Sequence, residues 1–379
     1  MRSLIIVIII IGLASSLGAQ SFFAMKGLGV ECLTYDAYAQ SLGNLVVLSS
    51  DHPAMPLGLK LTQLTGTLVY NFVLGEEAAQ RRLLSDIRPR YFAAKFPITP
   101  RLALGIKLNE IFNHNFEVYS ETINQGNYFA QRHIRGLGGI YNISGSGSYE
   151  LLPKMFRVGF EYGRLIGSSL EDWRFEILGG SYLTSDTVLY SYAGQRLRVG
   201  VAGSYQHFSL GLLFEELLTL NVQEKIISHN TIVNTNDSIR IKLPRAIGVG
   251  ISYEAMLVKV FLESYLRDWS RATINGQPLN YPYSLRLSGG FEYLFKECYP
   301  IRAGGYYYRW YLKDRAQRRI IEYGLTLGNR IIIRNFGGID YAITLAQRKG
   351  QLVKENILAL NLTLAYEEAF KRRTRRWGD

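Results

Sequence analysis

Apolar residues alternate with small or polar residues along positions 247–254, and this alternation constrains the fold more than any other feature of the chain. The apolar members are Ile247, Val249, Ile251 and Tyr253, and between them stand Gly248, Gly250, Ser252 and Glu254. Successive side chains of a β-strand point to opposite faces of its sheet, so a period of two predicts a strand with one apolar face. The pattern recurs along most of the chain, which favours an all-β protein.

Fourteen such strands are predicted. They cover residues 64–74, 87–97, 101–119, 135–150, 155–166, 196–206, 209–222, 245–254, 257–270, 284–295, 300–312, 320–333, 336–348 and 354–368. Short connections alternate with longer ones, which fall at 75–86, 120–134, 167–195, 223–244, 271–283, 313–319 and 349–353. An even number of antiparallel strands, with short turns at one end and long loops at the other, is typical of bacterial outer-membrane barrels. A further strand at 172–178 is an alternative, but it would make the strand count odd.

The polar face of these strands is rich in glycine, alanine and serine, which suit the inside of a barrel better than the surface of a soluble sheet. We therefore expect the large apolar side chains to face lipid and many of the 26 tyrosines to lie near strand ends, as aromatic girdles do. The expected lumen residues are Arg157, Glu161, Glu254, Lys259, Phe261, Glu263, Arg286 and Glu292. Opposite charges in this set can pair, and Phe261 either lines a pocket or packs within the barrel. A secreted, soluble β-protein is the alternative.

The N-terminus has the layout of a cleaved secretory signal peptide over residues 1–19. Arg2 precedes an unbroken apolar run from Leu4 to Ile11, and small residues follow. Export makes nucleic acid an improbable partner, although the formal net charge is +12. The two cysteines, Cys32 and Cys298, are expected to be separate buried thiols, with a disulfide between them as the alternative.

Residues 20–62, between the cleavage site and the barrel, are expected to form a plug inside the lumen. They are apolar, rich in small residues and punctuated by glycine and proline. The barrel then spans residues 63–370, and residues 371–379 form a basic tail that is either solvated or in contact with anionic lipid.

Within the plug, the run "GLGVECLTYDAYAQSLGNLVVLSSDHPAM" carries a G-x-G segment, an acidic residue among alanines, and a triplet that ends in Pro-Ala. The matching residues are Gly27, Gly29, Asp36, Ala37, Ala39, His52, Pro53 and Ala54. This run resembles the N-terminal hatch of the FadL family of outer-membrane hydrophobic-compound transporters, although His52 stands where that family has asparagine. The phrases "LPRAIGVGISY", "FLESYLRDWS" and "YPIRAGGYYY" farther along are also similar to the family. The resemblance implies a fourteen-stranded barrel with an intraluminal hatch.

The resemblance also implies passive uptake of hydrophobic small molecules, such as long-chain fatty acids or aromatic hydrocarbons, by a monomer in contact with outer-membrane lipid. It places an outer capture site in the long loops at 167–195 and 223–244. The residues of the first loop that would form it are Trp173, Phe175, Ile177, Tyr190 and Tyr192. The family has a kink on its third strand, whereas the glycines of 135–150 fall on the fourth predicted strand. Two alternatives are a non-transporting barrel that serves as a docking or shuttle component of a protein secretion system, and a porin for polar solutes.

No motif of catalysis or of metal or cofactor binding is found. The five histidines are scattered, and none has another histidine or a cysteine two to four residues away, as zinc sites require. The chain contains neither a phosphate-binding loop nor a G-x-S-x-G elbow. We therefore predict no catalytic residue, no metal and no cofactor.

Overall fold

The structure is a computed structural model, and it describes most of the chain. The described residues are 21–54, 61–77, 80–120, 122–125, 128–178, 183–228, 231–233, 238–295, 299–314, 317–333, 337–351 and 353–368. The predicted signal peptide, the basic tail and Cys298 lie outside these ranges, so those predictions stay predictions.

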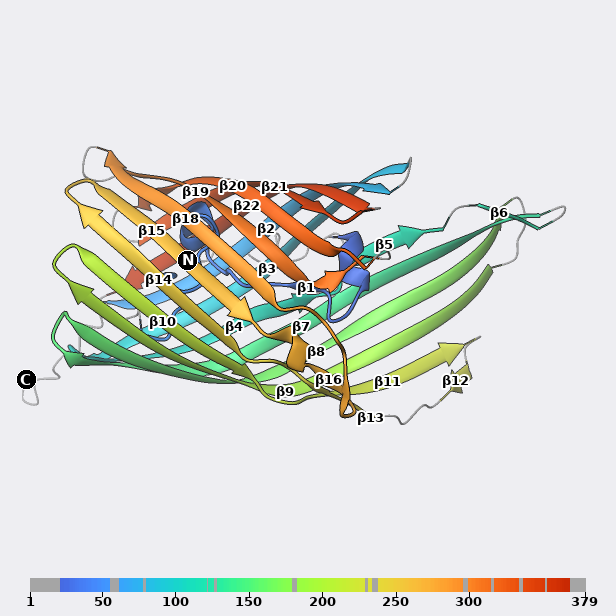
Figure 1. The fold of residues 1–379 in the computed structure, drawn as a ribbon, viewed down its shortest axis with the longest axis horizontal. Coiled ribbons are helices and arrows are strands. Elements are labelled where there is room, and N and C mark those ends of the chain that lie inside the picture. The colour runs from blue at the N-terminus through green and yellow to red at the C-terminus, as the bar shows by residue number, and fades with distance from the viewer. Residues whose placement is uncertain are drawn as a thin grey trace, which may run out of the picture.

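Antiparallel strands form one continuous sheet that closes into a barrel, because the first wall strand pairs with the last (Figure 1). Nine wall strands are single segments: β2 (Thr62–Glu77), β3 (Gln80–Thr99), β7 (Tyr128–Leu152), β8 (Phe156–Leu178), β9 (Leu183–Tyr205), β18 (Ser284–Phe295), β19 (Tyr299–Lys313), β20 (Arg319–Ile333) and β21 (Gly337–Lys349). The last wall strand, β22 (Val353–Glu368), is a single segment as well.

Four wall strands consist of more than one segment. They are β4 (Leu102–Asn113) with β5 (Phe116–Tyr119) and β6 (Ile123–Gln125); β10 (Phe208–Leu217) with β11 (Leu220–Ser228); β13 (Ser238–Lys242) with β14 (Ala246–Ala255); and β15 (Val258–Arg267) with β16 (Thr273–Ile274). Each wall strand pairs with its neighbours in chain order, which confirms the predicted fourteen-stranded barrel.

The remaining elements are short. They are η1 (Phe22–Met25), β1 (Val30–Glu31), α2 (Ala37–Ser41), β12 (Thr231–Val233), η2 (Trp269–Arg271) and β17 (Gln277–Pro278). Among the described residues, no helix is long and apolar enough to cross a membrane.

The two faces of the wall are as predicted. On β14, Ile247, Val249 and Ile251 point outward and are 56%, 45% and 45% exposed, whereas Gly250 and Ser252 are buried. The same holds around the barrel, where the outward positions are mainly Leu, Ile, Val, Phe and Tyr. A water-soluble barrel would have the reverse arrangement, so this wall is a transmembrane one.

Several long loops predicted at one end are wrong, since the strands continue through them. Residues 167–178 and 183–195 form the outer halves of β8 and β9, which stay paired as far as Glu176 and Leu183. Residues 75–77 and 80–86 likewise belong to β2 and β3, which pair as far as Glu77 and Gln80. Figure 1 shows β6, β7, β8, β9 and β11 reaching well beyond β2, β21 and β22 at this end. On the outer part of β8, charged residues such as Glu171 and Asp172 stand among the apolar ones, so the apolar alternation that marks a membrane strand fades there.

Candidate functional site

The N-terminal segment (residues 21–54) lies inside the barrel and hydrogen-bonds to strands on all sides. The Ser21 hydroxyl donates to Glu355 on β22 (2.9 Å), and the Gly43 amide donates to the Thr326 hydroxyl on β20 (2.9 Å). Farther along the segment, the backbone of Pro53 packs against Gly159 on β8. The segment therefore runs the length of the lumen, from the end with the extended strands to the end with the short turns.

Local chemistry explains how the segment bends. Gly27 and Gly29 have φ of 62° and 87°, a left-handed conformation that favours glycine, and at Gly29 a Cβ would lie 2.2 Å from the Asn113 carbonyl oxygen. Asp36 caps the single helical turn α2 by accepting the Ala39 amide at 2.7 Å, and it also accepts the Ser50 hydroxyl. Both predicted glycines and Asp36 are thus structural elements of this segment.

His52, the departure from the family motif, fits its site as a neutral imidazole. Its Nδ1 accepts the Ala54 amide (3.2 Å), so Nε2 carries the proton and donates to the Leu212 carbonyl on β10 (3.0 Å). Burial lowers the pKa of His52 to about 4. Gly200 on β9 makes room for the ring, since a Cβ there would come within 2.6 Å of it.

Glu263 on β15 holds the middle of the segment. Its carboxylate accepts the amides of three successive residues, Val46, Val47 and Leu48, at 2.5, 2.9 and 3.0 Å. Phe261, two residues earlier on the same face, packs in a buried cluster with Leu42, Leu45 and Leu48. In this structure Phe261 therefore contacts the segment and does not line an open pocket.

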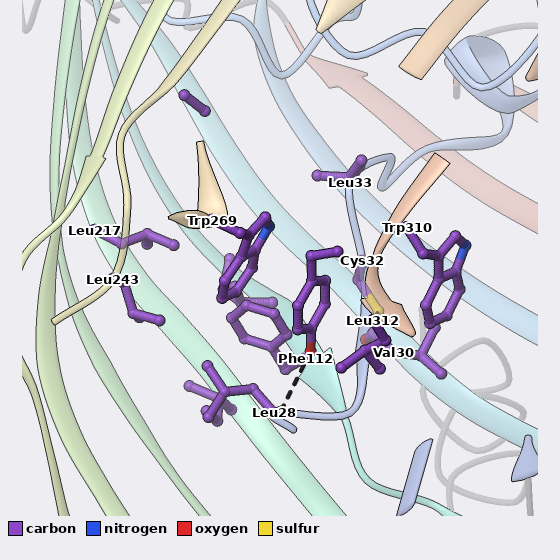
Figure 2. Close-up of a cluster of buried hydrophobic side chains, with 14 of the residues drawn as sticks. Leu28, Val30, Cys32, Leu33, Phe112, Leu217, Leu243, Trp269, Trp310 and Leu312 are labelled. Atoms are coloured by element: carbon purple, nitrogen blue, oxygen red, sulfur yellow. Dashed lines mark hydrogen bonds between the residues drawn. The ribbon is translucent and has the colours of Figure 1, made fainter. Parts of the chain in front are cut away.

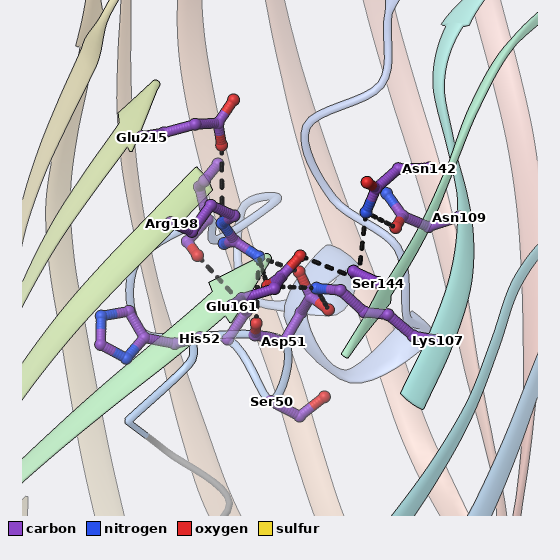
Figure 3. A network of polar contacts seen from close by, with 12 residues as sticks. Ser50, Asp51, His52, Lys107, Asn109, Asn142, Ser144, Glu161, Arg198 and Glu215 are labelled. Atoms are coloured by element: carbon purple, nitrogen blue, oxygen red, sulfur yellow. Dashed lines mark hydrogen bonds and ion pairs between the residues drawn. The ribbon is translucent and has the colours of Figure 1, made fainter. Parts of the chain in front are cut away.

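Buried charges join the segment to the wall (Figure 3). Asp51 pairs with Lys107 on β4 (2.6 Å) and with Arg198 on β9 (2.7 Å), and both cations also pair with Glu161 on β8, at 2.8 and 3.0 Å. At the outer end, Arg267 joins Glu31 of the segment (3.0 Å) to Glu215 of the wall (2.5 Å). The prediction that Glu161 points into the lumen agrees with this arrangement.

The other predicted lumen residues fall into two groups. Two lie away from the strand ends, inside the barrel, and three lie close to the strand ends. Arg286 is buried beneath the rings of Tyr306 and Tyr308, 4.6 and 5.4 Å from their centroids. Glu292 pairs with Arg302 at 2.6 Å.

Three predicted lumen residues lie at the rim of the short-turn end. Glu254 and Lys259 flank the turn between β14 and β15, where they pair at 3.3 Å with substantial exposure, and Arg157 is the second residue of β8. Because a strand end is open to solvent, these three are partly exposed and do not lie in the enclosed lumen.

The third wall strand is interrupted, and this leaves a gap in the wall pairing. Beyond the pair Tyr91–Asn109, β4 no longer pairs with β3 in the described structure, and β1 of the segment takes the freed edge through Val30–Asn113 and Glu31–Phe112. We call this unpaired stretch, between residues 80–90 of β3 and residues 110–119, the seam. The periodicity of the sequence did not locate it, whereas the family resemblance implied a kink on this strand.

Side chains and one glycine accommodate the seam. Arg88 on β3 donates to Glu110 on β4 (2.9 Å), and Asn115 donates to Asp86 (3.3 Å). On the fourth wall strand, opposite the interruption, Gly138 has φ of 110° and exchanges hydrogen bonds with residues 114–115. The glycines of 135–150 thus accompany a break that lies on the third strand, where the resemblance implied it.

The five predicted capture residues lie on one face of the β8–β9 extension. Trp173, Phe175 and Ile177 alternate along β8, and Tyr190 and Tyr192 stand opposite Ser169 and Gly167. Directly opposed residues point to the same side, and the Ser169 hydroxyl lies 2.7 Å from that of Tyr192. This is the inner face, because it continues into the buried Leu165.

On this inner face Ser169 and Glu171 stand between Leu165 and Trp173, and the Trp173 indole donates to Glu171. Below them lies an apolar cluster at the outer end of the lumen (Figure 2). There the Trp269 ring stacks on Tyr311 with centroids 3.9 Å apart and meets Phe112 edge-on. Leu28 of the N-terminal segment packs in the same cluster, and its amide donates to the Tyr311 hydroxyl. The apolar cluster therefore includes the N-terminal segment itself.

Deeper in, a cavity of about 100 Å³ separates the segment from strands β2, β3 and β18–β22. Its lining is mixed, with Arg90, Arg286, Asn71 and Asn361 beside Trp310. It is smaller than the engineered 150 Å³ cavity that admits benzene, so passage of such a molecule requires the segment to move.

Solved structures share this architecture at low sequence identity. The toluene transporter TbuX of Ralstonia pickettii is covered over 99% of its chain and 89% of this one, at 14% identity and a TM-score of 0.58. A FadL homologue of Pseudomonas aeruginosa is covered over 99% of its chain and 90% of this one, at 11% identity and a TM-score of 0.60. The Pseudomonas putida toluene transporter TodX is covered over 99% of its chain and 90% of this one, at 12% identity and a TM-score of 0.59.

The chain has the FadL-type barrel fold. The resemblance drawn from short motifs is thereby confirmed for the fold. No protein-family model matches the sequence, and no curated protein matches it. Among the described residues of this FadL-type barrel, no group of three or more His, Cys, Asp or Glu side chains could hold a metal ion.

Proposed function

We propose that the protein is an outer-membrane channel for the passive uptake of hydrophobic small molecules such as long-chain fatty acids or aromatic hydrocarbons. One observation carries the proposal: an inner face rich in aromatic side chains leads from the outer mouth to an apolar cluster on a plugged lumen, beside an unpaired seam. The names of the similar structures, two toluene transporters and a FadL homologue, support the same substrate class.

In this proposal the extension of β8 and β9 captures the solute. Trp173 is 43% exposed and Tyr190 is half-buried, so their rings offer apolar area to a solute in the mouth. Burial of apolar surface drives the solute inward along this face, because each square ångström removed from water contributes roughly 25 cal/mol.

The N-terminal segment then acts as the hatch. While β1 is paired with β4, it occupies the edge that β3 leaves free, and the mixed cavity behind it is too small for the solute. When β1 leaves β4, the apolar cluster joins the seam, and the solute passes sideways into the membrane without crossing the charged end of the lumen. This sideways exit avoids the Asp51 network, which an apolar solute would have to desolvate.

A disulfide lock tests the gating step. Val30 and Asn113 are directly opposed across β1 and β4, at a spacing that an antiparallel pair and a disulfide share. We expect Val30→Cys/Asn113→Cys, in a background with Cys32 and Cys298 replaced by serine, to lose saturable liposome uptake of labelled fatty acid and toluene when oxidised. Reduction should restore uptake.

The matched control joins two wall strands that are already paired. Thr67 and Thr363 are directly opposed on β2 and β22, and their hydroxyls lie 2.8 Å apart. Thr67→Cys/Thr363→Cys should transport equally well in both redox states. Absence of saturable uptake by the correctly folded native barrel would overturn the function, whereas uptake unaffected by the Val30–Asn113 lock would overturn the hatch.

A further inference from the structure

A patch of basic side chains lies on the outward face of the barrel, at the end with the extended strands. It consists of Arg309 and Lys313 on β19, Arg319 on β20, Lys349 on β21 and Lys354 on β22. Their inward neighbours Trp310, Ile320, Arg348 and Glu355 are buried, which sets the outward direction of the patch. We call these five residues the rim patch.

The rim patch brings like charges together, and its one directly opposed carboxylate among the described residues is Glu76, which faces Lys354 across β2 and β22. Lys349 stands directly opposite Lys354, and Lys313 directly opposite Arg319. Like charges directly opposed on a sheet are destabilising. Among the described residues, no carboxylate lies within 4.0 Å of any of the five, whereas the neighbouring Arg81 is paired with Glu76 (3.0 Å).

Arg309 and Arg319 are held in place although they lack a carboxylate. The Tyr283 hydroxyl accepts Arg309 Nη1 at 3.0 Å, and the guanidinium of Arg319 lies 4.8 Å from the centre of the Tyr283 ring. Two guanidiniums fixed around one phenol are suited to bind phosphate oxygens.

Apolar grooves run directly beneath the rim patch on the same outward face. One, of about 720 Å³, is lined by Leu74, Leu83, Tyr323, Leu325, Leu345 and Leu358. A second, of about 520 Å³, is lined by Ile251, Leu262, Leu287 and Tyr307, and the two meet at Gly305. Lys349 is four residues from Leu345 along β21, roughly 13 Å, which is the distance from a lipid headgroup into its acyl chains.

The grooves exist because two directly opposed positions have no side chain. Gly289 faces Gly305 across β18 and β19, and a Cβ on either would contact the outward-facing leucines Leu262 and Leu325. Elsewhere this face is covered by large apolar side chains. The chain thus combines an unpaired cationic rim with hollows in the lipid-facing surface just below it.

We propose that this face is a binding site for a phosphorylated, multiply acylated glycolipid of the lipopolysaccharide class, with its phosphates on the rim patch and its acyl chains in the two grooves. Two grooves under five cations fit a lipid with several chains and more than one phosphate better than a phospholipid with a single phosphate. The site does not depend on the proposed uptake function, since it lies on the outside of the wall.

Binding of defined lipids to the full-length barrel in detergent tests the site, with native mass spectrometry as the readout. The probes are hexa-acyl bisphosphoryl lipid A, its dephosphorylated form, and phosphatidylglycerol. Each lysine near the headgroups contributes about fivefold, so Lys349→Gln/Lys354→Gln should weaken lipid A binding about 25-fold and leave the dephosphorylated lipid unaffected. Gly305→Leu, which fills both grooves, should weaken binding of both lipids.

The control removes the same charge from another part of the rim. Lys242 and Arg245 are exposed near the outer end of the eighth wall strand, and Arg245 is already paired with Glu216 (2.9 Å). Lys242→Gln/Arg245→Gln should bind lipid A as the native protein does. Equal losses in the two double variants, or equal affinity for lipid A and phosphatidylglycerol in the native protein, would overturn the proposal, and so would full binding by Gly305→Leu.

Discussion

Glu263→Gln tests whether the N-terminal segment is a removable hatch. The carboxylate of Glu263 accepts three amides of the segment and makes no ion pair within 4.0 Å with a described residue. The substitution keeps the shape of the side chain, and it replaces one acceptor oxygen by an NH₂ group that cannot accept an amide. Its effect therefore falls on the docking of residues 46–48 more than on the wall.

The expected cost follows from the hydrogen bonds. At least one of the three is lost, worth about 2 kcal/mol because its acceptor is charged. The remaining two lose the charge assistance, at about 0.5–1 kcal/mol each. The total of about 3–4 kcal/mol shifts the balance between docked and undocked segment by roughly two to three orders of magnitude.

Planar-bilayer conductance and liposome swelling with a small sugar report the undocked state. We expect Glu263→Gln to show frequent open events and faster swelling than the native barrel, while its strand content by circular dichroism is unchanged. The control is Glu254→Gln on the same hairpin, since Glu254 is exposed, pairs with Lys259 and has no hydrogen bond or ion pair to the described part of the segment. If the two variants conduct alike, the segment is not held by Glu263, and the docking argument fails.

Three further predictions concern the lipid face, the hatch and the mouth. Val249→Arg places a charge on an outward position of β14 and should cost about 2–4 kcal/mol in folding into lipid vesicles, whereas Val249→Leu should be neutral; equal folding midpoints in urea would contradict the outward assignment. His52 has a pKa of about 4 in the docked segment, below its ordinary value, so docking is fully stabilised above about pH 6.5 and weakens as the pH falls toward 4. Conductance should therefore rise as the pH is lowered over this window, and this rise should be absent in His52→Gln. Trp173→Ala/Tyr190→Ala removes two rings of the inner face and should raise the KM for uptake about fivefold, for a loss of about 1 kcal/mol, with conductance unchanged; an unchanged KM would remove the capture role.

The wall could be predicted from the sequence because one physical constraint acts on every membrane strand. Lipid on one side and the lumen on the other impose a period of two, and Val249, Ile251 and Leu262 show it plainly. Where lipid ends, the constraint ends as well. Strands β8 and β9 continue past the bilayer with charged residues such as Glu171 and Asp172 among apolar ones, and the sequence there was interpreted as a loop.

The partners of the lumen charges could not be predicted. Asp51 lies 56 residues from Lys107 and 147 from Arg198, and no local spacing links them. The alternation does place these two cations on the inward face, so a search for buried cations on that face would have found the candidates but not the pairing. The seam is still harder to predict from the sequence. Residues 110–119, "EIFNHNFEVY", contain neither glycine nor proline, the residues that usually mark an interrupted strand.

One carboxylate links the hatch to the seam, and this gives the gating proposal its physical basis. Glu110 is fully buried at the point where β4 leaves β3. It accepts Arg88 from β3 (2.9 Å), Asn113 from its own strand (2.7 Å) and the thiol of Cys32 from the N-terminal segment (3.4 Å). Burial, reinforced by Glu110, raises the pKa of Cys32 to about 12, so the thiol stays protonated and can donate.

Withdrawal of the segment removes both the β1 edge and this thiol from the β4 side of the seam. The Glu110 carboxylate then has only wall donors, and Arg88 becomes its principal partner across an edge that has no backbone pairing. Breaking a buried charged pair costs several kcal/mol unless water replaces the lost partner. A seam that opens after the hatch moves, once water reaches Glu110, therefore needs less free energy than one that opens first, so hatch release should precede lateral opening.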